Sequence, residues 1–142
     1  MKTNNILLPF DGSEYSVNAA NYALGLAKLT GAHVNIVHCD EWKLEFAEVP
    51  ESLVEQIRIN RKKEAQILLK KAEGIFENQD IKYTLETISG PPGELLTERA
   101  KSGEYDLIIM GSHGHSGITG LFLGSVTHKV LNKIYCPVLI VP

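Results

Sequence analysis

Short, mostly apolar runs recur along the chain and are separated by longer segments with a different periodicity. The runs at 6–10, 34–39, 107–110 and 138–141 are of strand length, and we expect each to form a strand. The continuous apolar run at 6–10 is typical of a strand that is covered on both faces. Between 81 and 87, apolar and polar residues alternate, which predicts a half-exposed strand at an edge of the sheet.

The segments between these strands have the spacing and the terminal residues of helices. The first helix is predicted to begin near Glu14, with Asp11 or Ser13 as its N-cap, and to end at Gly31. Pro50 is well placed to begin a long second helix, after an irregular segment over 40–49. The inward face of this second helix is expected to consist of Val54, Ile57, Ala65, Leu68, Ala72 and Ile75.

Two shorter helices are predicted in the second half of the chain. One follows Pro91-Pro92-Gly93 and extends through Ala100, and the other follows Gly124. Strands that alternate with helices predict an α/β fold built from βαβ units. We therefore expect a doubly wound open sheet of about five parallel strands with helices on both faces. Ligands of such sheets bind at the carboxyl ends of the strands, where the strand order reverses.

The most informative stretch, 105–127, consists of a predicted strand, a glycine-rich loop and the start of a helix. Five of the chain's 12 glycines lie between 111 and 124. Glycine lets backbone N–H groups approach an anion closely, and a helix N-terminus favours negative charge. The stretch therefore predicts a phosphate site made of N–H groups from 111–114 and 124–127, with added hydroxyls from Ser112, Ser125 and Thr127. The alternative is a loop that merely caps the helix, with Ser125 as the N-cap.

Composition and charge narrow the class of protein. A chain of 142 residues with 44% hydrophobic and 22% charged residues is typical of one globular domain, here 1–142. The formal net charge of −3, with no basic cluster beyond 61–63, argues against nucleic-acid binding. No apolar run approaches the ~18 residues of a membrane span, and the N-terminus lacks the apolar region of a signal peptide. We expect a cytoplasmic protein that does not bind membranes. Cys39 and Cys136 are isolated, which suggests neither a disulfide framework nor a zinc site.

Three separated segments resemble the universal stress protein family. The spacing Gly111-x2-Gly114-x9-Gly124-Ser125 is similar to the motif of ATP-binding members, and it is neither a Walker P-loop nor a dinucleotide fingerprint. Residues 6–13 (Ile-Leu-Leu-Pro-Phe-Asp-Gly-Ser) resemble the family's first strand and turn. Residues 105–114 and 136–142 resemble its fourth and fifth strands. The resemblance implies the strand order 3-2-1-4-5, which places the ligand between the first and fourth strands.

The resemblance also implies a set of nucleotide-binding residues. Asp11 is expected to accept hydrogen bonds from ribose hydroxyls, or simply to cap the first helix. Val37 and Cys39 lie where adenine is expected, although both could be ordinary core residues. The expected ligand is ATP, with Mg²⁺ or Mn²⁺ held through its phosphates, and AMP is an open alternative. The full expected set is Pro9, Phe10, Asp11, Val37, Cys39, Met110, Gly111, Ser112, His113, Gly114, Gly124, Ser125, Val126 and Thr127.

A last apolar strand at the edge of a sheet invites pairing with another chain. Because universal stress proteins commonly dimerise through this strand, we expect a homodimer. The residues expected to form it are Val138, Leu139, Ile140 and Val141.

The charges of the loop bear on whether ATP is turned over. No Lys or Arg occurs between 104 and 128. We expect His113 to donate to phosphate and His115 to be solvated, since a metal pair would lack a third ligand. Phosphoryl transfer usually relies on a Lys, an Arg and a positioned base. A regulatory ATP-binding module in stress response is thus the favoured function. The alternatives are a slow metal-dependent ATPase or phosphotransferase, and a stress-linked interaction protein that binds AMP or no nucleotide.

Overall fold

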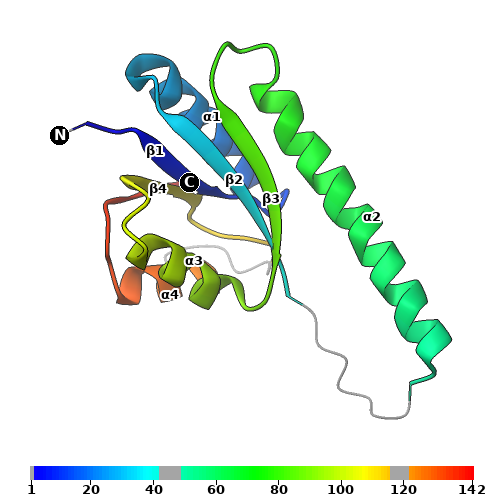
Figure 1. The fold of residues 1–142 in the computed structure, drawn as a ribbon. Coiled ribbons are helices and arrows are strands. Elements are labelled where there is room, and N and C mark those ends of the chain that lie inside the picture. The colour runs from blue at the N-terminus through cyan, green and yellow to red at the C-terminus, as the bar shows by residue number, and fades with distance from the viewer. Residues whose placement is uncertain (1, 42–48, 116–121) are drawn as a thin grey trace.

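The computed structural model describes residues 2–41, 49–115 and 122–142 and contains one open sheet of five parallel strands (Figure 1). The strand order is β3-β2-β1-β4-β5, as expected. The predicted fold class is therefore confirmed. The strands are β1 (Asn5–Pro9), β2 (His33–Asp40), β3 (Tyr83–Ser89), β4 (Leu107–Gly111) and β5 (Val138–Val141).

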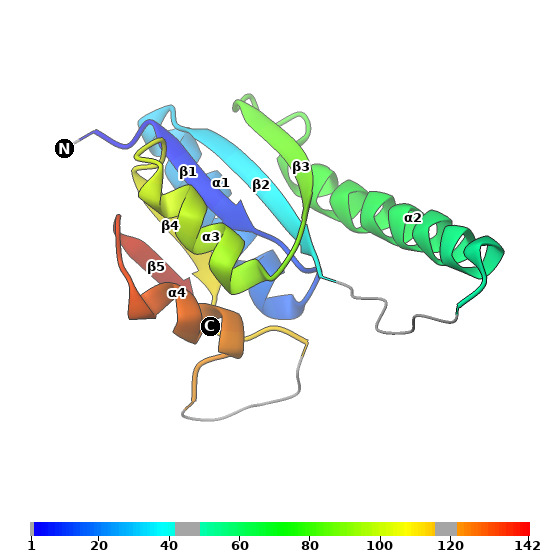
Figure 2. The same ribbon diagram turned by 60° about the horizontal axis from the view of Figure 1, so that its bottom comes forward.

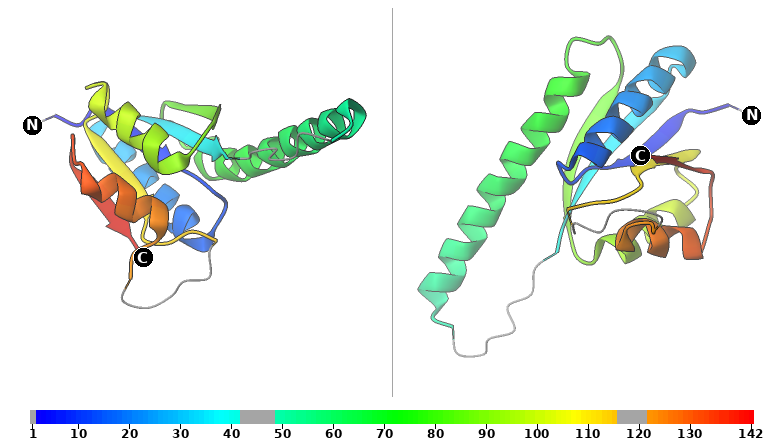
Figure 3. Two further views of the ribbon diagram at one scale, coloured as in Figure 1. Left: turned by 90° about the horizontal axis from the view of Figure 1, so that it is seen from below. Right: turned by 180° about the vertical axis from the view of Figure 1, so that it is seen from behind.

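Two helices cover each face of the sheet (Figures 2 and 3). One face carries α1 (Glu14–Thr30) and α2 (Glu51–Phe76), and the other carries α3 (Pro92–Lys101) and α4 (Ser125–Asn132). Strand alternation explains the two cores, because Ile6 and Leu8 of β1 pack under α1 whereas Leu7 between them packs under α3 and α4. No helix in the described ranges is both long and apolar enough to span a membrane.

The first helix begins and ends as its sequence predicts. Ser13 is the N-cap, and its hydroxyl accepts a hydrogen bond from the Ser16 N–H at 3.2 Å. Asp11 stabilises the turn before the helix, because its carboxylate accepts a hydrogen bond from the Ser13 N–H at 2.9 Å. Gly31 ends the helix with φ 76°, a left-handed conformation that glycine adopts without strain.

The second helix is longer than the sheet that it covers. Its 26 residues span roughly 39 Å, whereas the eight residues of β2 span about 26 Å. Its N-terminal turns extend past the strand ends (Figure 1). The predicted inward face is correct from Ala65 to Ile75, whereas Val54 and Ile57 near the N-terminus are only partly buried and do not belong to the core. The sequence missed Phe76, which is fully buried at the other end. Most of the irregular segment predicted over 40–49 lies outside the described residues.

Strand pairing places the functional turns. The predicted edge strand at 81–87 is found at 83–89, because it follows β2 in register from Val34↔Tyr83 to Asp40↔Ser89. β1 pairs with β2 as far as Pro9↔Val37, so β2 continues for three residues beyond β1. β4 pairs with β1 on the other side. The turns that follow β1 and β4 therefore lie next to each other at the point where the strand order reverses.

Candidate functional site

A cavity of about 230 Å³ opens at the carboxyl ends of β1, β2 and β4. Every residue of the expected nucleotide-binding set lines it except Ser112. Its lining also includes five residues that were not expected to bind nucleotide: Ser16, His38, Pro92, Leu96 and His115. Three of these five (Ser16, Pro92 and Leu96) belong to α1 and α3, and the sequence signals at strand ends and in the glycine-rich loop do not extend to them.

One end of the cavity is the start of α4. Gly124 is the N-cap of α4, so Ser125 is not the cap that the alternative interpretation of the loop required. Ser125, Val126 and Thr127 are the first three helical residues, and the N–H groups of such residues have no partner within an α-helix. All three line the cavity. The helix dipole adds partial positive charge here, so this end suits an anion.

Two of the three hydroxyls expected to bind phosphate are engaged within the protein. Thr127 is buried, and its Oγ1 donates to the Gly111 carbonyl at 2.8 Å. The Ser112 hydroxyl contacts Nδ1 of His113 at 2.8 Å, and the Ser112 N–H donates to the Val141 carbonyl at 2.8 Å. These contacts tie the loop to β5 and α4. Ser125, by contrast, is exposed and lines the cavity, so its hydroxyl is the one placed to meet a ligand.

The three motif glycines have different surroundings. A Cβ at Gly111 would lie 2.7 Å from Cβ of Tyr15, so this glycine lets α1 pack directly on β4. A Cβ at Gly124 would lie 3.1 Å from Cα of His113, and the Gly124 N–H donates to the Ser112 carbonyl at 2.8 Å. A Cβ at Gly114 would lie 2.9 Å from Oδ2 of Asp11, across the cavity. Of the three, only Gly114 has a side-chain atom of the turn after β1 as the near neighbour of its added Cβ.

The two loop histidines join segments of the protein. Nε2 of His113 donates to the Phe122 carbonyl, and Nδ1 of the same ring contacts the Ser112 hydroxyl. His113 therefore connects the two sides of the loop, and because it also lines the cavity, its role as a phosphate donor stays a prediction. Nε2 of His115 donates to the Asp11 carbonyl at 2.6 Å, so His115 links the loop to the turn after β1 although its side chain is 66% exposed. Within the described ranges, no three His, Cys, Asp or Glu residues are grouped to hold a metal.

The opposite end of the cavity has apolar walls. Val37, Leu96 and Met110 form part of the core beneath α3, and Cys39 and Val126 pack at its margin. Burial raises the pKa of the Cys39 thiol to about 11, so this thiol stays protonated at neutral pH and is a poor nucleophile. This end suits a flat apolar group.

Main-chain groups of β2 add polarity to these apolar walls. The Phe10 N–H donates to the Val37 carbonyl at 2.9 Å, so alternate residues of β2 direct their N–H and C=O groups toward β1. Cys39 is the next residue of β2 whose N–H and C=O groups point toward the β1 side. It lies beyond the last β1–β2 pair, Pro9↔Val37. In the described part of the chain, no backbone hydrogen bond joins Cys39 to the β1 side. One donor and one acceptor therefore face the apolar end of the cavity.

The fold and this site define a class of α/β proteins with a ligand crevice at the switch point of a parallel sheet. The chain matches the profile of the Universal stress protein family over residues 2–142. It is 35% identical to Universal stress protein MJ0531 of Methanocaldococcus jannaschii, over 96% of this chain and 80% of that protein. It is 33% identical to Universal stress protein YxiE of Bacillus subtilis, over 97% and 98%. The chain belongs to the universal stress protein family.

Solved structures have the same fold. The structure of MJ0577 from M. jannaschii aligns with a TM-score of 0.84 at 28% identity, over 99% of this chain and 96% of that one. A universal stress protein in complex with cAMP aligns with a TM-score of 0.74 at 22% identity, over 99% and 98%. One from Archaeoglobus fulgidus in complex with dAMP aligns with a TM-score of 0.68 at 19% identity, over the full length of both chains.

Proposed function

We propose that this chain is a regulatory module that binds an adenine nucleotide, with ATP as the ligand, in the cavity at the ends of β1, β2 and β4. The observation that carries the proposal is that the two ends of the cavity differ in chemical character. Apolar walls with one main-chain donor and acceptor at Cys39 lie at one end, and the N–H groups at the start of α4 lie at the other. Adenine presents a donor and an acceptor on one edge, and phosphates are bound well by helix N-termini. The relatives solved with cAMP and dAMP support an adenine nucleotide.

We choose ATP as the ligand because two segments of the chain border the phosphate end of the cavity. The start of α4 supplies the N–H groups of Ser125, Val126 and Thr127, and residues 113–115 line the cavity beside them, which supports binding of more than one phosphate group. Asp11 is the one carboxylate among the described residues that line the cavity. A Mg²⁺ or Mn²⁺ ion would thus be held mainly by the nucleotide's phosphates and water, with Asp11 as the protein group able to contact it. Such an ion would neutralise phosphate charge in a cavity whose described lining contains no Lys or Arg.

Titration of the isotope-labelled protein with Mg-ATP, followed by amide NMR, tests the site. We expect the largest shifts at the amides of Cys39, Gly114, Ser125, Val126 and Thr127, since these border the cavity or its N–H-rich end. Amides of α2 around Gly74 serve as an internal control, because this position does not line the cavity. Shifts confined to another part of the surface, with the Cys39 and Gly114 amides unmoved, would place the nucleotide elsewhere and refute the proposal.

We further propose a homodimer that forms through β5. This strand lies at one edge of the sheet, and Val138, Leu139 and Ile140 are only partly buried although all are apolar. Exposed Ile134 and Tyr135 precede it and extend the apolar surface. Sedimentation velocity at about 50 µM is expected to give the mass of a dimer, because exposed apolar edges favour a symmetric pair. A single species with the monomer mass would contradict this proposal.

A further inference from the structure

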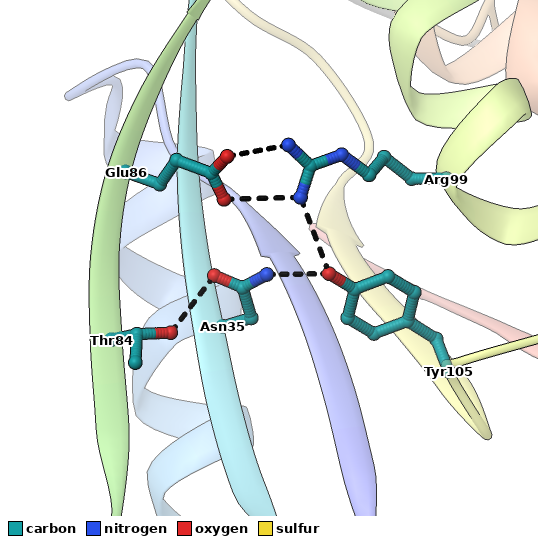
Figure 4. A network of polar contacts seen from close by, with 5 residues as sticks. All are labelled: Asn35, Thr84, Glu86, Arg99 and Tyr105. Carbon is teal, nitrogen blue, oxygen red and sulfur yellow. Dashed lines mark hydrogen bonds and ion pairs between the residues drawn. The ribbon is translucent and has the colours of Figure 1, made fainter. Parts of the chain in front are cut away.

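Five polar side chains form one continuous network beneath α3 (Figure 4). Arg99 of α3 faces Glu86 of β3 through two hydrogen bonds, with a distance of 3.0 Å between Nη1 and Oε2. The same Nη1 donates to the Tyr105 hydroxyl at 3.4 Å. Asn35 of β2 donates to that hydroxyl through Nδ2, and Thr84 of β3 donates to Asn35 at 3.0 Å. The network thus joins two strands, one helix and the segment before β4.

The pair at the centre of this network has a defined geometry. The planar guanidinium matches the carboxylate at two points, which fixes direction as well as distance. The hydrogen bond from Arg99 lowers the pKa of the Glu86 carboxyl, so the pair stays ionised at neutral pH. Its side chains are 28% and 37% exposed, and pairs with this exposure contribute little to overall stability. The geometry of the pair therefore matters more than its contribution to the free energy of unfolding.

A second set of contacts holds the other end of α3. The Lys129 side chain of α4 lies against Gly93, where a Cβ would approach its Cδ to 2.7 Å. Nζ of Lys129 then pairs with Glu94 at 2.9 Å. The first turn of α3 is therefore joined to α4, whereas Arg99 joins its last turn to β3. Between the two attachments, one turn before Arg99, lies Leu96.

Leu96 connects this arrangement to the cavity. It is only 1% exposed, packs in the core beneath α3 and lines the apolar end together with Pro92. The charges of Arg99 and Glu86 both act on the thiol of Cys39, which lines the same end. The N–H groups at the other end belong to α4 and to the glycine loop, which the network does not contact. Arg99 lies in the last turn of α3, whereas α4 is attached to the first turn of α3 and is also held to the glycine loop by the hydrogen bond from Thr127 to the Gly111 carbonyl. A shift of the last turn of α3 would thus alter the apolar end more than the phosphate end.

We propose that the Glu86–Arg99 pair, supported by Tyr105 and Asn35, positions α3 and so sets the fit of the base at the apolar end of the cavity. This inference rests on the proposed nucleotide function. Arg99 and Glu86 are positioning residues that act through Leu96. Neither side chain lines the cavity, so both act on the base only through the packing of α3.

Calorimetric titration with three ligands separates the two ends of the cavity. For Arg99→Leu we expect the Kd values of ATP and adenosine to rise about fivefold, while the Kd of magnesium tripolyphosphate stays within about twofold of the unmodified value. Arg99→Lys keeps the charge but loses the two-point geometry, and it should recover part of the affinity for adenosine. The matched control is Arg58→Leu, which removes an exposed ion pair with Glu55 on α2 and should change none of the three Kd values.

Several outcomes would overturn the inference. If the unmodified protein binds ATP and Arg99→Leu binds ATP and adenosine equally well, the pair does not position the base. If tripolyphosphate weakens by the same factor as ATP, the substitution has loosened the whole cavity. Should Arg99→Leu fail to fold, Glu86→Gln provides the same comparison with a smaller change. An unmodified protein that binds none of the three ligands would refute the proposed function itself, and this inference with it.

Discussion

Gly114→Val is expected to abolish nucleotide binding and to leave the fold intact. A Cβ at this position would lie 2.9 Å from Oδ2 of Asp11, on the side of the glycine loop that faces the cavity. The two further methyl groups of valine would occupy the space through which phosphates reach the N–H groups of the loop. Since Gly114 contacts no core side chain, the melting temperature should stay within about 3 °C. Calorimetry should give a Kd for Mg-ATP at least about a hundredfold weaker than that of the unmodified chain.

Gly25→Ala is the matched control for this substitution. Gly25 lies in α1, where a Cβ would meet no atom within 4 Å. Alanine should bind ATP as the unmodified chain does, and it should add about 0.5–1 kcal/mol of helix stability. Retention of ATP binding by Gly114→Val within about tenfold of the control would show that the nucleotide does not approach this part of the loop.

Gly111→Ala is expected to destabilise the fold by about 3 kcal/mol, although it adds only one methyl group. The new Cβ would lie 2.7 Å from Cβ of Tyr15 and 2.9 Å from its carbonyl carbon, so the backbone of α1 would have to move. β4 cannot easily yield, because the Gly111 carbonyl accepts from Thr127 and the next N–H donates to Val141. Urea denaturation followed by circular dichroism measures the loss.

The comparison of Gly111→Ala with Gly25→Ala isolates the effect of packing. Both substitutions add the same methyl group, one against a helix backbone and the other into open space. A loss of less than about 1 kcal/mol at Gly111 would mean that α1 and β4 can separate without cost, contrary to the packing described.

The sequence predicted most elements because their signals are local. Ser13 and Gly31 mark the ends of α1 through their own conformations, and apolar runs of strand length mark buried strands. The end of β3 was misplaced by two residues because pairing with β2, at the distant positions Asp40↔Ser89, extends the strand beyond its alternating segment. The strand order came from the family resemblance, and the structure confirms it.

In the site, the features that the sequence did not predict are contacts between residues that are separated along the chain. Glycine spacing correctly placed the loop at the cavity, but it could not show that Gly111 packs against Tyr15, which is 96 positions earlier in the chain. Nor could spacing show that His113 is held by the Phe122 carbonyl, since that contact depends on how the loop closes. Leu96 was missed for a similar reason. Its helical pattern predicts burial, and only the packing of α3 on β2 brings it to the cavity.

The central claim is that this cavity holds an adenine nucleotide, and calorimetric titration of the nucleotide-free, unmodified chain with Mg-ATP tests it most directly. The account predicts saturable binding of one ATP per chain with a Kd in the micromolar range, about −8 kcal/mol. The heat should vanish in Gly114→Val and persist in Gly25→Ala. No heat of binding from the unmodified chain, and no nucleotide released when the freshly purified protein is denatured, would contradict the account.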